Sequence, residues 1–384
     1  MDLVVFGDDW NAHPSTTQHL IMNMDEEDRI VWVDSLGFRS PRLSITDGKR
    51  LLAKAGSMFS ERVGSGSGNV PGDGGKQPRR FVRIAPVILP YHLNPLARAL
   101  NVFSLRRAIG AAMERLEIQS PYWLSVTPVA VQYRAAVPHR RLAYLRLDDY
   151  ADLPGVDAGL IQRTERRMMA ASQIIFATAK KLLPPDFKEK SHYLPQGVDT
   201  AHFARTPLEP PKRRILGFFG LVAEWLDFDL IEAVARAAGD WTLEFIGPVR
   251  YRPAKLERIA NISWKPAVSF EDLPRAIKGW TCAWIPFQVS SLTAAVNPLK
   301  VREYLAAGLA THCTPLPEVE ALVSRTDILI SRNAREIADW LERSHAADSA
   351  ESRRKRRRSV ADDSWEERAR TLRDLFTGSG EKAA

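Results

Sequence analysis

The sequence is poor in cysteine and lacks long apolar runs, and each absence excludes a class of protein. Its only cysteines, Cys282 and Cys313, lie in apolar segments without a His or Cys at ligand spacing. We therefore expect two core thiols of a reduced compartment and neither a disulfide framework nor a metal centre. No run of about eighteen apolar residues occurs, and the start MDLVVFGDDW does not have the pattern of a signal peptide. The prediction is a cytoplasmic protein.

Acidic residues are the minority charge. There are 54 Lys and Arg against 46 Asp and Glu, which gives a formal net charge of +8. A basic excess favours anionic partners such as nucleotide diphosphates, lipid headgroups or nucleic acid. No nucleic-acid-binding motif is recognisable, so nucleic acid is not an expected partner.

Two segments hold much of the basic charge. The first, ESRRKRRR at residues 351–358, is predicted to be a solvated helix face. The second, residues 78–107, interleaves Arg with Phe, Val, Ile, Leu and Tyr. That composition suits a peripheral contact with anionic lipid on the inner membrane face and equally a buried amphipathic helix.

Short apolar runs followed by helical patterns recur along the chain and indicate parallel βαβ units. The predicted strands fall into two series. The first series is 3–6, 30–33, 122–126, 142–147 and 173–178; the second is 215–220, 242–247, 261–264, 281–287 and 310–314. The fold class is α/β, with two Rossmann-like domains facing each other across a cleft.

Composition suggests where the domains divide. Residues 195–214 contain four prolines and end in charges, as linkers often do. The predicted domains are residues 1–200 and 201–361, with a helix at 362–378 that returns to the first domain. The segment 63–77 is rich in Gly, Ser and Pro, and we expect a loop inside the first domain.

The most informative stretch is VNPLKVREYLAAG at residues 296–308. It predicts a helix that begins after a loop, with Lys300 and Glu303 on one face. The helix start offers backbone N–H groups and a positive dipole end to a phosphate. Lys300 adds a charge there, and Glu303 can accept hydrogen bonds from sugar hydroxyls. The alternative is an ordinary surface pair.

This stretch resembles the donor-binding helix of GT-B glycosyltransferases, particularly the family-4-like enzymes of polysaccharide assembly. The resemblance implies that Glu303 binds the ribose of a nucleotide and that the residues before it, Asn297 and Lys300, meet the diphosphate. The family's earlier Glu, eight residues before the ribose ligand, is Ala295 here. The resemblance also implies a nucleotide-sugar donor, with no metal or other cofactor.

Other donor-binding candidates follow the first two strands of the second series. Gly220 ends a predicted strand and leaves backbone room for a ligand, and Glu224 is predicted to begin the next helix. Trp264 and Lys265 follow a short strand, where the nucleotide base rests in the GT-B fold; Trp264 is equally typical of a core aromatic. The family's Arg and Lys clamp is missing after Gly220, so we expect Lys300, helix N-termini or an arginine such as Arg250 to hold the diphosphate.

The first domain offers acceptor-side candidates after its first strand. Asp8 and Asp9 follow that strand, and Ser15 with Gln18 forms a capping-box pattern that predicts a helix start near Pro14. Asp9, Ser15 and a catalytic candidate, His13, would then lie at the carboxyl edge of a parallel sheet, where ligands bind. The alternative is a set of ordinary loop and turn residues.

Asp148 and Asp149 follow another strand of the first domain. A carboxylate there can deprotonate an acceptor hydroxyl if a neighbouring acid raises its pKa; the alternative is an ordinary helix cap. The surrounding residues resemble the D-D-Y segment of these glycosyltransferases. We predict Asp149 as the general base, with Asp148 next. A protein base favours inversion of the anomeric carbon, whereas family-4 relatives retain its configuration without one.

Together these patterns predict a metal-independent glycosyltransferase that moves a sugar, most simply from a UDP-sugar, to a hydroxyl of a glycan or lipid-linked acceptor. Two alternatives stay open. A GT-B-fold epimerase would isomerise the donor without any acceptor, and a non-catalytic basic protein would bind nucleic acid with a steep salt dependence.

Overall fold

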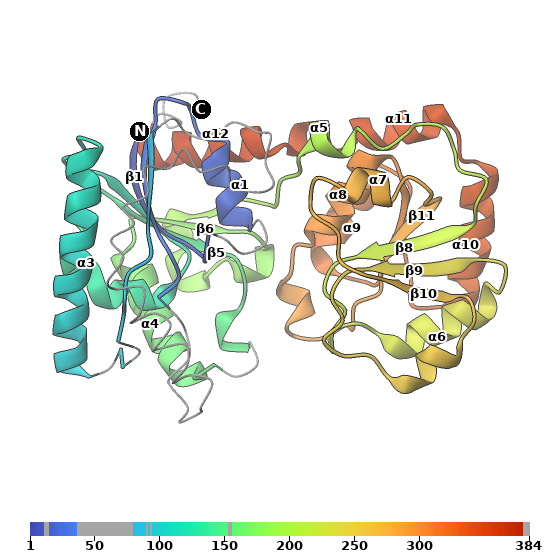
Figure 1. The fold of residues 1–384 in the computed structure, drawn as a ribbon, viewed down its shortest axis with the longest axis horizontal. Helices are drawn as coiled ribbons and strands as arrows, with labels where there is room; N and C mark the ends of the chain where they lie inside the picture. Colours follow the sequence, from blue (N-terminus) through green and yellow to red (C-terminus); the bar gives the residue numbers. More distant parts are fainter. Residues whose placement is uncertain (11–14, 37–79, 90, 93, 153–155, 379–384) are drawn as a thin grey trace. The chain divides into compact units, whose positions relative to one another are not determined.

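A computed structural model describes residues 1–10, 15–36, 80–89, 91–92, 94–152 and 156–378. The chain divides into two compact units. The first unit comprises Met1–Pro195 and the segment that begins at Ala369, and the second unit comprises Gln196–Arg368 (Figure 1). Among the described residues, no helix is both long enough and apolar enough to cross a bilayer. The predicted loop at 63–77 and His13 lie outside the described residues.

The first unit is built on a seven-stranded parallel sheet in the order β3-β2-β1-β4-β5-β6-β7. Its strands are β1 (Asp2–Phe6), β2 (Arg29–Val33), β3 (Arg80–Ile84), β4 (Tyr122–Ser125), β5 (Leu142–Arg146), β6 (Ile174–Ala177) and β7 (Ser191–Tyr193). Its described helices are α1 (Thr16–Met22), α3 (Pro95–Arg115) and α4 (Ala158–Ala171), with 3-10 turns η2 (Pro128–Ala136), η3 (Tyr150–Asp152), η4 (Lys180–Leu182) and η5 (Pro185–Lys190).

Strand alternation explains how this sheet is covered. Val4 and Phe6 of β1 join one core with Leu105 of α3 and Ile161 of α4. Successive side chains of a strand point to opposite faces, so Leu3 and Val5 face the other side of the sheet. The order reverses between β1 and β4, and that switch point is where the carboxyl ends of the strands leave room for a ligand.

The second unit is built on a six-stranded parallel sheet in the order β10-β9-β8-β11-β12-β13. Its strands are β8 (Ile215–Phe219), β9 (Thr242–Ile246), β10 (Ile262–Lys265), β11 (Cys282–Ile285), β12 (Ala310–Cys313) and β13 (Ile328–Ile330). Its helices are α5 (Thr200–Phe203), α6 (Phe228–Ala237), α7 (Leu273–Ala276), α8 (Leu299–Ala307), α9 (Pro317–Val323), α10 (Ala334–Ala346) and α11 (Ala350–Arg358), with 3-10 turns η6 (Ala254–Arg258), η7 (Thr293–Ala295) and η8 (Ala361–Asp363).

Two apolar cores cover this sheet. Ile215 and Phe219 of β8 pack with α5, α7 and α8 on one face, whereas Leu216 and Phe218 pack with α6 and α10 on the other. The two predicted core thiols, Cys282 on β11 and Cys313 on β12, are free and buried in this sheet. Burial raises the pKa of both. The order reverses between β8 and β11, which places a second switch point there.

The predicted strands all correspond to observed ones, and the fold class is confirmed. Three strands were not predicted: β3, β7 and β13. Each of the three lies at an edge of its sheet. In addition, β3 falls inside the basic segment 78–107. The expected linker is wrong over part of its length, because residues 196–206 pack on the second unit and Phe203 is fully buried in its core.

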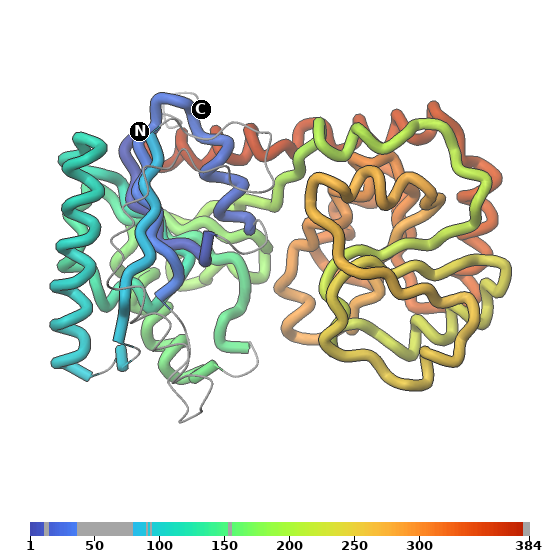
Figure 2. The backbone as a smooth tube through the Cα atoms, viewed as in Figure 1, coloured from blue at the N-terminus to red at the C-terminus, as the bar shows by residue number. Residues whose placement is uncertain are grey.

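The C-terminal helix α12 (Trp365–Thr377) has residues in both units. Its start lies in the second unit, where the Trp365 ring lies against Gly197. Its later part, at the end of the traced chain in Figure 2, lies in the first unit. There the Arg141 guanidinium donates to the Phe376 carbonyl at 2.9 Å, and Arg373 pairs with Asp28 at 3.2 Å. The predicted return of a final helix to the first domain is therefore confirmed.

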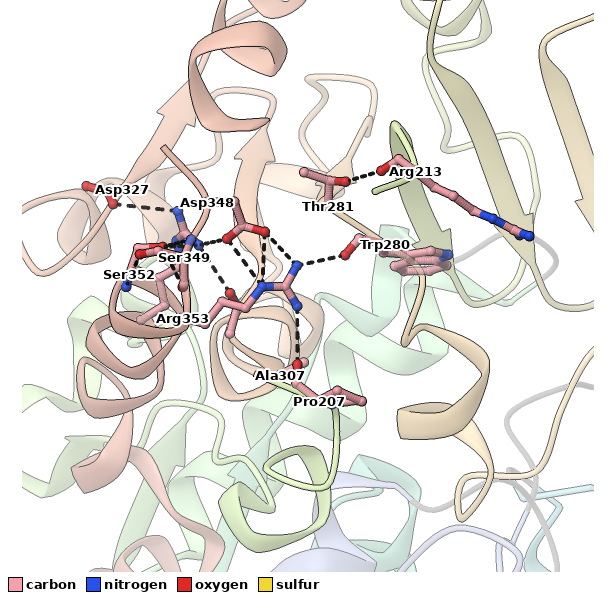
Figure 3. Close-up of polar contacts among 12 residues, drawn as sticks. Pro207, Arg213, Trp280, Thr281, Ala307, Asp327, Asp348, Ser349, Ser352 and Arg353 are labelled. Carbon is pink, nitrogen blue, oxygen red and sulfur yellow. Dashed lines mark hydrogen bonds and ion pairs between the residues drawn. The ribbon is translucent and has the colours of Figure 1, made fainter. Parts of the chain in front are cut away.

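The basic helix α11 is not the solvated face that the sequence predicts. Arg353 is fully buried, and Arg356 is 3% exposed. Arg353 donates from Nη2 to the Asp348 carboxylate at 2.7 Å and to the Trp280 carbonyl at 3.1 Å (Figure 3). Arg356 donates to the same carboxylate at 3.1 Å. Two of the six basic residues of this stretch therefore form buried contacts that hold the second unit together.

Arg353→Gln is expected to destabilise the second unit by about 3 kcal/mol, because it removes one partner of a buried ion pair. Arg354 is exposed on the same helix, and Arg354→Gln should change the free energy of unfolding by less than about 0.5 kcal/mol. Denaturant titration of both variants checks this. Equal effects of the two would show that the buried contacts contribute little.

Candidate functional site

The candidate donor side lies at the carboxyl edge of the second unit's sheet. Gly220 follows β8 with φ 133°, a backbone conformation that favours glycine. Gly247 follows β9 with φ 147°, and a Cβ there would lie 2.2 Å from the Gly220 carbonyl oxygen. The two strand ends approach so closely that only glycine fits at 247. The ends of β8 and β9 are therefore in direct backbone contact at this edge.

Lys300 lies directly against this backbone. A Cβ built on Gly220 would be 2.5 Å from Lys300 Cε and 3.0 Å from its Nζ. The ammonium lies 6.0 Å from the ring centroids of Phe218 and Phe219. Lys300 is half-buried, and burial lowers its pKa, while Glu303 acts in the opposite direction. The side chain of Lys300 is thus placed over the end of β8, beside the switch point.

Glu303 stands one turn further along α8. Burial raises the pKa of its carboxyl to about 7, although the positive charge of Lys300 opposes the rise. Within the described residues, the two side chains form no ion pair with each other. The neighbouring Tyr304 hydroxyl accepts a hydrogen bond from the Phe219 N–H at 3.2 Å, which holds α8 against β8. Lys300 and Glu303 therefore do not form the surface pair of the alternative interpretation.

The start of α8 adds a positive dipole end at the same place. Pro298 precedes the helix and provides no side-chain cap, and Gly308 ends the helix in the left-handed conformation. The helix connects β11 to β12, so its N-terminus follows the carboxyl end of β11. Uncapped N–H groups, a helix dipole and a lysine at one switch point favour binding of a diphosphate.

The structure places the other donor-side candidates differently. Asn297 is 3% exposed. Its amide donates to Glu318 at 3.2 Å and accepts from Arg302 at 2.7 Å. Both ends of this amide have protein partners, so Asn297 has the contacts of a residue that positions the start of α8.

The prediction that Glu224 begins a helix is wrong. Helix α6 begins three residues after Trp225, and the Asp227 side chain caps it by accepting from the Leu230 N–H. Glu224 is exposed and pairs with Arg250 at 2.6 Å. The Arg250 guanidinium also stacks 4.9 Å from the Trp225 ring centroid. An arginine is therefore present in the loop after β9, near the end of β8.

Trp264 and Lys265 lie on the edge strand β10. The Trp264 ring stacks on Phe245 with 4.6 Å between centroids, and the Arg252 guanidinium covers it at 4.9 Å. Lys265 is exposed, and its carbonyl accepts from the Gly247 N–H at 3.2 Å. These contacts favour the core interpretation of Trp264. Lys265 is the last residue of β10 and is exposed.

In the first unit, the corresponding edge brings two carboxyls together. Asp8 follows β1 and Asp148 follows β5, and both strands flank β4. Burial raises the pKa of Asp148 to about 7, with further contributions from the charges of Asp8 and Asp149. Burial also raises the pKa of Asp8, which the Ser15 side chain opposes by hydrogen bonding. The Trp32 indole donates to the Asp8 carbonyl at 3.1 Å and fixes this turn.

Asp149 has a different environment. Its carboxylate lies 3.9 Å from the Arg146 guanidinium, and its side chain is 32% exposed. The Arg146 guanidinium therefore competes with a substrate hydroxyl for this carboxylate. The geometry therefore favours Asp148 over Asp149 as the proton acceptor, in the reverse order to the sequence-based prediction.

The remaining acceptor-side candidates are placed as follows. Ser15 caps α1, and its capping box with Gln18 is confirmed. Asp9 is exposed, and its carbonyl accepts from the Gln18 amide at 3.3 Å. His13 lies outside the described residues. Ser15 is thus tied to Asp8 and to the helix start.

Comparison with known proteins supports the same architecture. TuaH of Bacillus subtilis strain 168, named as a candidate teichuronic acid biosynthesis glycosyltransferase, is 28% identical over 176 residues. The match covers 42% of this chain and 43% of TuaH, so it spans less than half of that relative's length. No family model matches the chain.

Three solved structures resemble the whole chain. HepE of Anabaena in complex with UDP and glucose has a TM-score of 0.65 at 10% identity, covering 98% of this chain and 99% of that one. A glycosyltransferase of Rickettsia africae scores 0.64 at 12% identity over 100% and 99% of the chains. Sucrose-phosphate synthase of Thermosynechococcus elongatus scores 0.62 at 12% identity over 100% of both. The chain has the GT-B fold.

Within this GT-B fold, sequence reasoning missed three contributors to the candidate site. Tyr304 and Gly247 shape the edge beside Lys300. Tyr150 is buried, and its pKa is raised first by burial and then by the charge of Asp148. Tyr304 belongs to the same motif as Glu303, so the motif contained a signal for it. Gly247 had the same strand-end position as Gly220.

Proposed function

We propose that this protein is a glycosyltransferase that moves a sugar from a nucleotide-diphosphate donor to a hydroxyl of a glycan or lipid-linked acceptor in cell-surface polysaccharide synthesis. One observation carries the proposal: Lys300 lies against Gly220 at the switch point, with Glu303 one turn further on α8. The name of TuaH and the complexes of HepE with UDP and with UDP-glucose support it. UDP is therefore the simplest donor carrier.

On the donor side, we propose that Lys300 and the start of α8 stabilise the negative charge of the leaving diphosphate. Negative charge grows on the diphosphate as the bond to the sugar breaks, and a fixed ammonium and helix dipole stabilise it in the transition state. Glu303 accepts hydrogen bonds from the ribose hydroxyls. Arg250 lies in the loop after β9 and replaces the absent family clamp. The proposal needs no metal.

On the acceptor side, Asp148 takes the proton of the attacking hydroxyl. A carboxyl with a pKa of about 7 is a stronger base than an ordinary aspartate and is ionised in a substantial fraction of molecules at neutral pH. Asp8 supports this role, because two nearby carboxyls resist double ionisation. Inversion at the anomeric carbon is the outcome that a protein base favours, and the configuration of the product tests it.

The acceptor's lipid carrier gives a reason for membrane contact. The proposal includes a peripheral contact with the inner membrane face through residues 78–107, which contain β3 and the first part of α3. The two alternatives gain no support from the structure. Arg353 and Arg356 are buried inside the second unit, which weakens the case for a nucleic-acid-binding helix. Incubation of UDP-glucose without an acceptor tests the other alternative, because an epimerase would isomerise the sugar.

Binding of UDP-glucose is expected to strengthen as pH rises from 6 to 8. The ribose hydroxyls donate to the ionised Glu303, whose folded pKa of about 7 means that roughly a tenth of the carboxyls are ionised at pH 6 and nine tenths at pH 8. Affinity should rise about ninefold over this range, with proton release. Calorimetry in buffers of different ionisation enthalpy measures both.

Glu303→Gln supplies the control, because the amide does not titrate and should remove the pH dependence. UDP-glucose is the appropriate probe, since its diphosphate, unlike that of UDP, carries no group that titrates near pH 6. A ninefold rise that persists in Glu303→Gln would assign the titration to another residue and would remove Glu303 from the ribose site.

A further inference from the structure

Helix α3 exposes a stripe of large apolar side chains, here called the α3 stripe: Leu96, Leu100 and Phe103. They are 78%, 60% and 69% exposed. Their spacing of four and three residues puts them on one face of the helix. Nearby Tyr91 is 58% exposed. Five of the nine exposed large hydrophobic side chains among the described residues lie between positions 89 and 103.

The α3 stripe is not the face that packs on the sheet. Leu105, Ile109 and Met113 form the buried side of α3 and join the core of the first unit. A surface helix of a soluble protein normally has polar residues opposite its core stripe. α3 is apolar on both sides, and Figure 1 shows it as a long helix at the margin of the first unit. An apolar face of this kind marks a docking surface.

The stripe is presented by a fixed element. The Asn94 side chain caps α3 by accepting from the Leu96 and Ala97 N–H groups. The Asn101 side chain accepts from the Leu89 N–H at 2.8 Å and donates to the Leu89 carbonyl at 2.9 Å. This pair of bonds holds the exposed Leu89 segment beside the helix. The apolar side chains therefore share one supported surface.

Basic residues predominate in the sequence around the stripe, and the exposed Glu114 lies further along the same helix. From residue 78 to residue 113 the sequence contains six arginines and no acidic residue. Arg98 and Arg107 are exposed on α3, and Arg107 continues the stripe one turn beyond Phe103. Arginine next to exposed Leu, Phe and Tyr is the composition of helices that lie in the headgroup region of anionic membranes.

We propose that the α3 stripe inserts into the headgroup region of a membrane rich in anionic lipid, with Arg98 and Arg107 against the lipid phosphates. A second copy of the chain fits less well, because a twofold contact centred on the stripe would bring Arg98 and Arg107 of both copies together. The inference deepens the proposed function, on which its purpose rests: a membrane-bound transferase meets a lipid-linked acceptor at that surface. Lipid binding itself requires no activity.

Sedimentation with vesicles tests the proposal. The full chain is mixed with vesicles of phosphatidylcholine alone or of phosphatidylcholine with 30% phosphatidylglycerol. We expect binding to the anionic vesicles, at least tenfold weaker binding to the neutral ones, and a loss of at least tenfold on Leu100→Gln with Phe103→Gln. Val323→Gln, which replaces an apolar side chain that is 40% exposed in the second unit, should bind as the wild type does.

A charge-matched pair separates local recognition from net charge. Arg98→Gln with Arg107→Gln should weaken binding to anionic vesicles severalfold, whereas Arg354→Gln with Arg358→Gln, which removes two exposed charges from α11, should not. Equal effects of the two pairs would overturn the assignment to α3, as would vesicle binding that survives Leu100→Gln with Phe103→Gln.

Light scattering distinguishes the second copy. A wild-type dimer that becomes monomeric on Leu100→Gln with Phe103→Gln, without vesicle binding by either form, would overturn the membrane proposal in favour of a protein interface. UDP-glucose binding separates this inference from the proposed function. A wild type that binds UDP-glucose but not anionic vesicles would contradict the role of the α3 stripe. A wild type that binds anionic vesicles but not UDP-glucose would contradict the transferase.

Discussion

Lys300→Met is expected to lower the rate of sugar transfer about 10²–10³-fold while the second unit keeps its stability. The ammonium lies beside Gly220 at the switch point, where the leaving diphosphate is proposed to bind. Methionine keeps the apolar stem against Phe218 and Phe219 but removes the charge. Burial already lowers the Lys300 pKa, so loss of the charge removes a desolvation cost from the folded state. Turnover with a UDP-sugar and denaturant titration measure the two effects.

Lys278→Met is the matched control. Lys278 is exposed beside the short helix α7, away from the strand ends at Gly220 and Gly247, and its loss should leave turnover within about twofold. A similar fall in turnover for both variants would mean that the general positive charge of the unit matters and that Lys300 has no special position. A fall in stability that matches the loss of turnover would make Lys300 a packing residue.

Asp148→Asn is expected to lower transfer about 10²–10⁴-fold and to leave UDP-glucose affinity unchanged. Asparagine keeps the shape of the side chain but cannot take a proton. Because burial and the neighbouring carboxyls raise the Asp148 pKa to about 7, the base is protonated at low pH. Wild-type transfer should therefore rise with pH up to about 7 and then level off. Asp149→Asn should cost less, because Arg146 already pairs with that carboxylate.

The two aspartate variants decide between the sequence-based and structural assignments. If Asp149→Asn abolishes transfer and Asp148→Asn does not, the general base is Asp149, as the sequence pattern predicts. If neither variant changes turnover, no carboxyl at this edge acts as a base. Asp8→Asn gives a further readout: removal of its charge should shift the pH midpoint of transfer downward, because one of the groups that raises the Asp148 pKa is lost.

Most of the fold could be predicted because its interior strands are apolar on both faces. Runs such as those of β1, β8 and β11 are fully or largely buried, and such runs are visible in sequence. The edge strand β3 was missed because Arg80 and Arg83 interrupt its apolar pattern; Arg83 pairs with Asp34 at 2.6 Å. Partial exposure at an edge tolerates charge, so the strand signal is weak there.

Buried arginines were missed for a related reason. The stretch around Arg353 looks uniformly charged, and only the fold shows that Asp348 and the Trp280 carbonyl receive the inward-pointing side chains. The spacing of Arg353, Arg356 and Arg357 was the available signal, since positions three and four apart share a helix face. A charge run on one face can therefore satisfy buried acceptors while its other face is solvated.

The candidate site could be predicted in type but not in detail. The α8 motif pointed to Lys300 and Glu303, and both lie at the strand edge that the motif implies. The preference for Asp148 depends on its burial and then on the charge of Asp8, both of which are set by the fold and are invisible in two adjacent aspartates. Similarly, Glu224 looked like a helix start, but Asp227 provides the cap three residues later.

The central claim is that the second unit holds a nucleotide sugar at the start of α8. Calorimetric titration of UDP-glucose into the wild type and Glu303→Ala, with the unfolding temperature of each, tests it most directly. The account predicts binding to the wild type, at least tenfold weaker binding to the variant because the ribose hydroxyls lose a charged acceptor, and little change in unfolding temperature. Absence of binding to the folded wild type, or equal affinities of the two proteins, would contradict it.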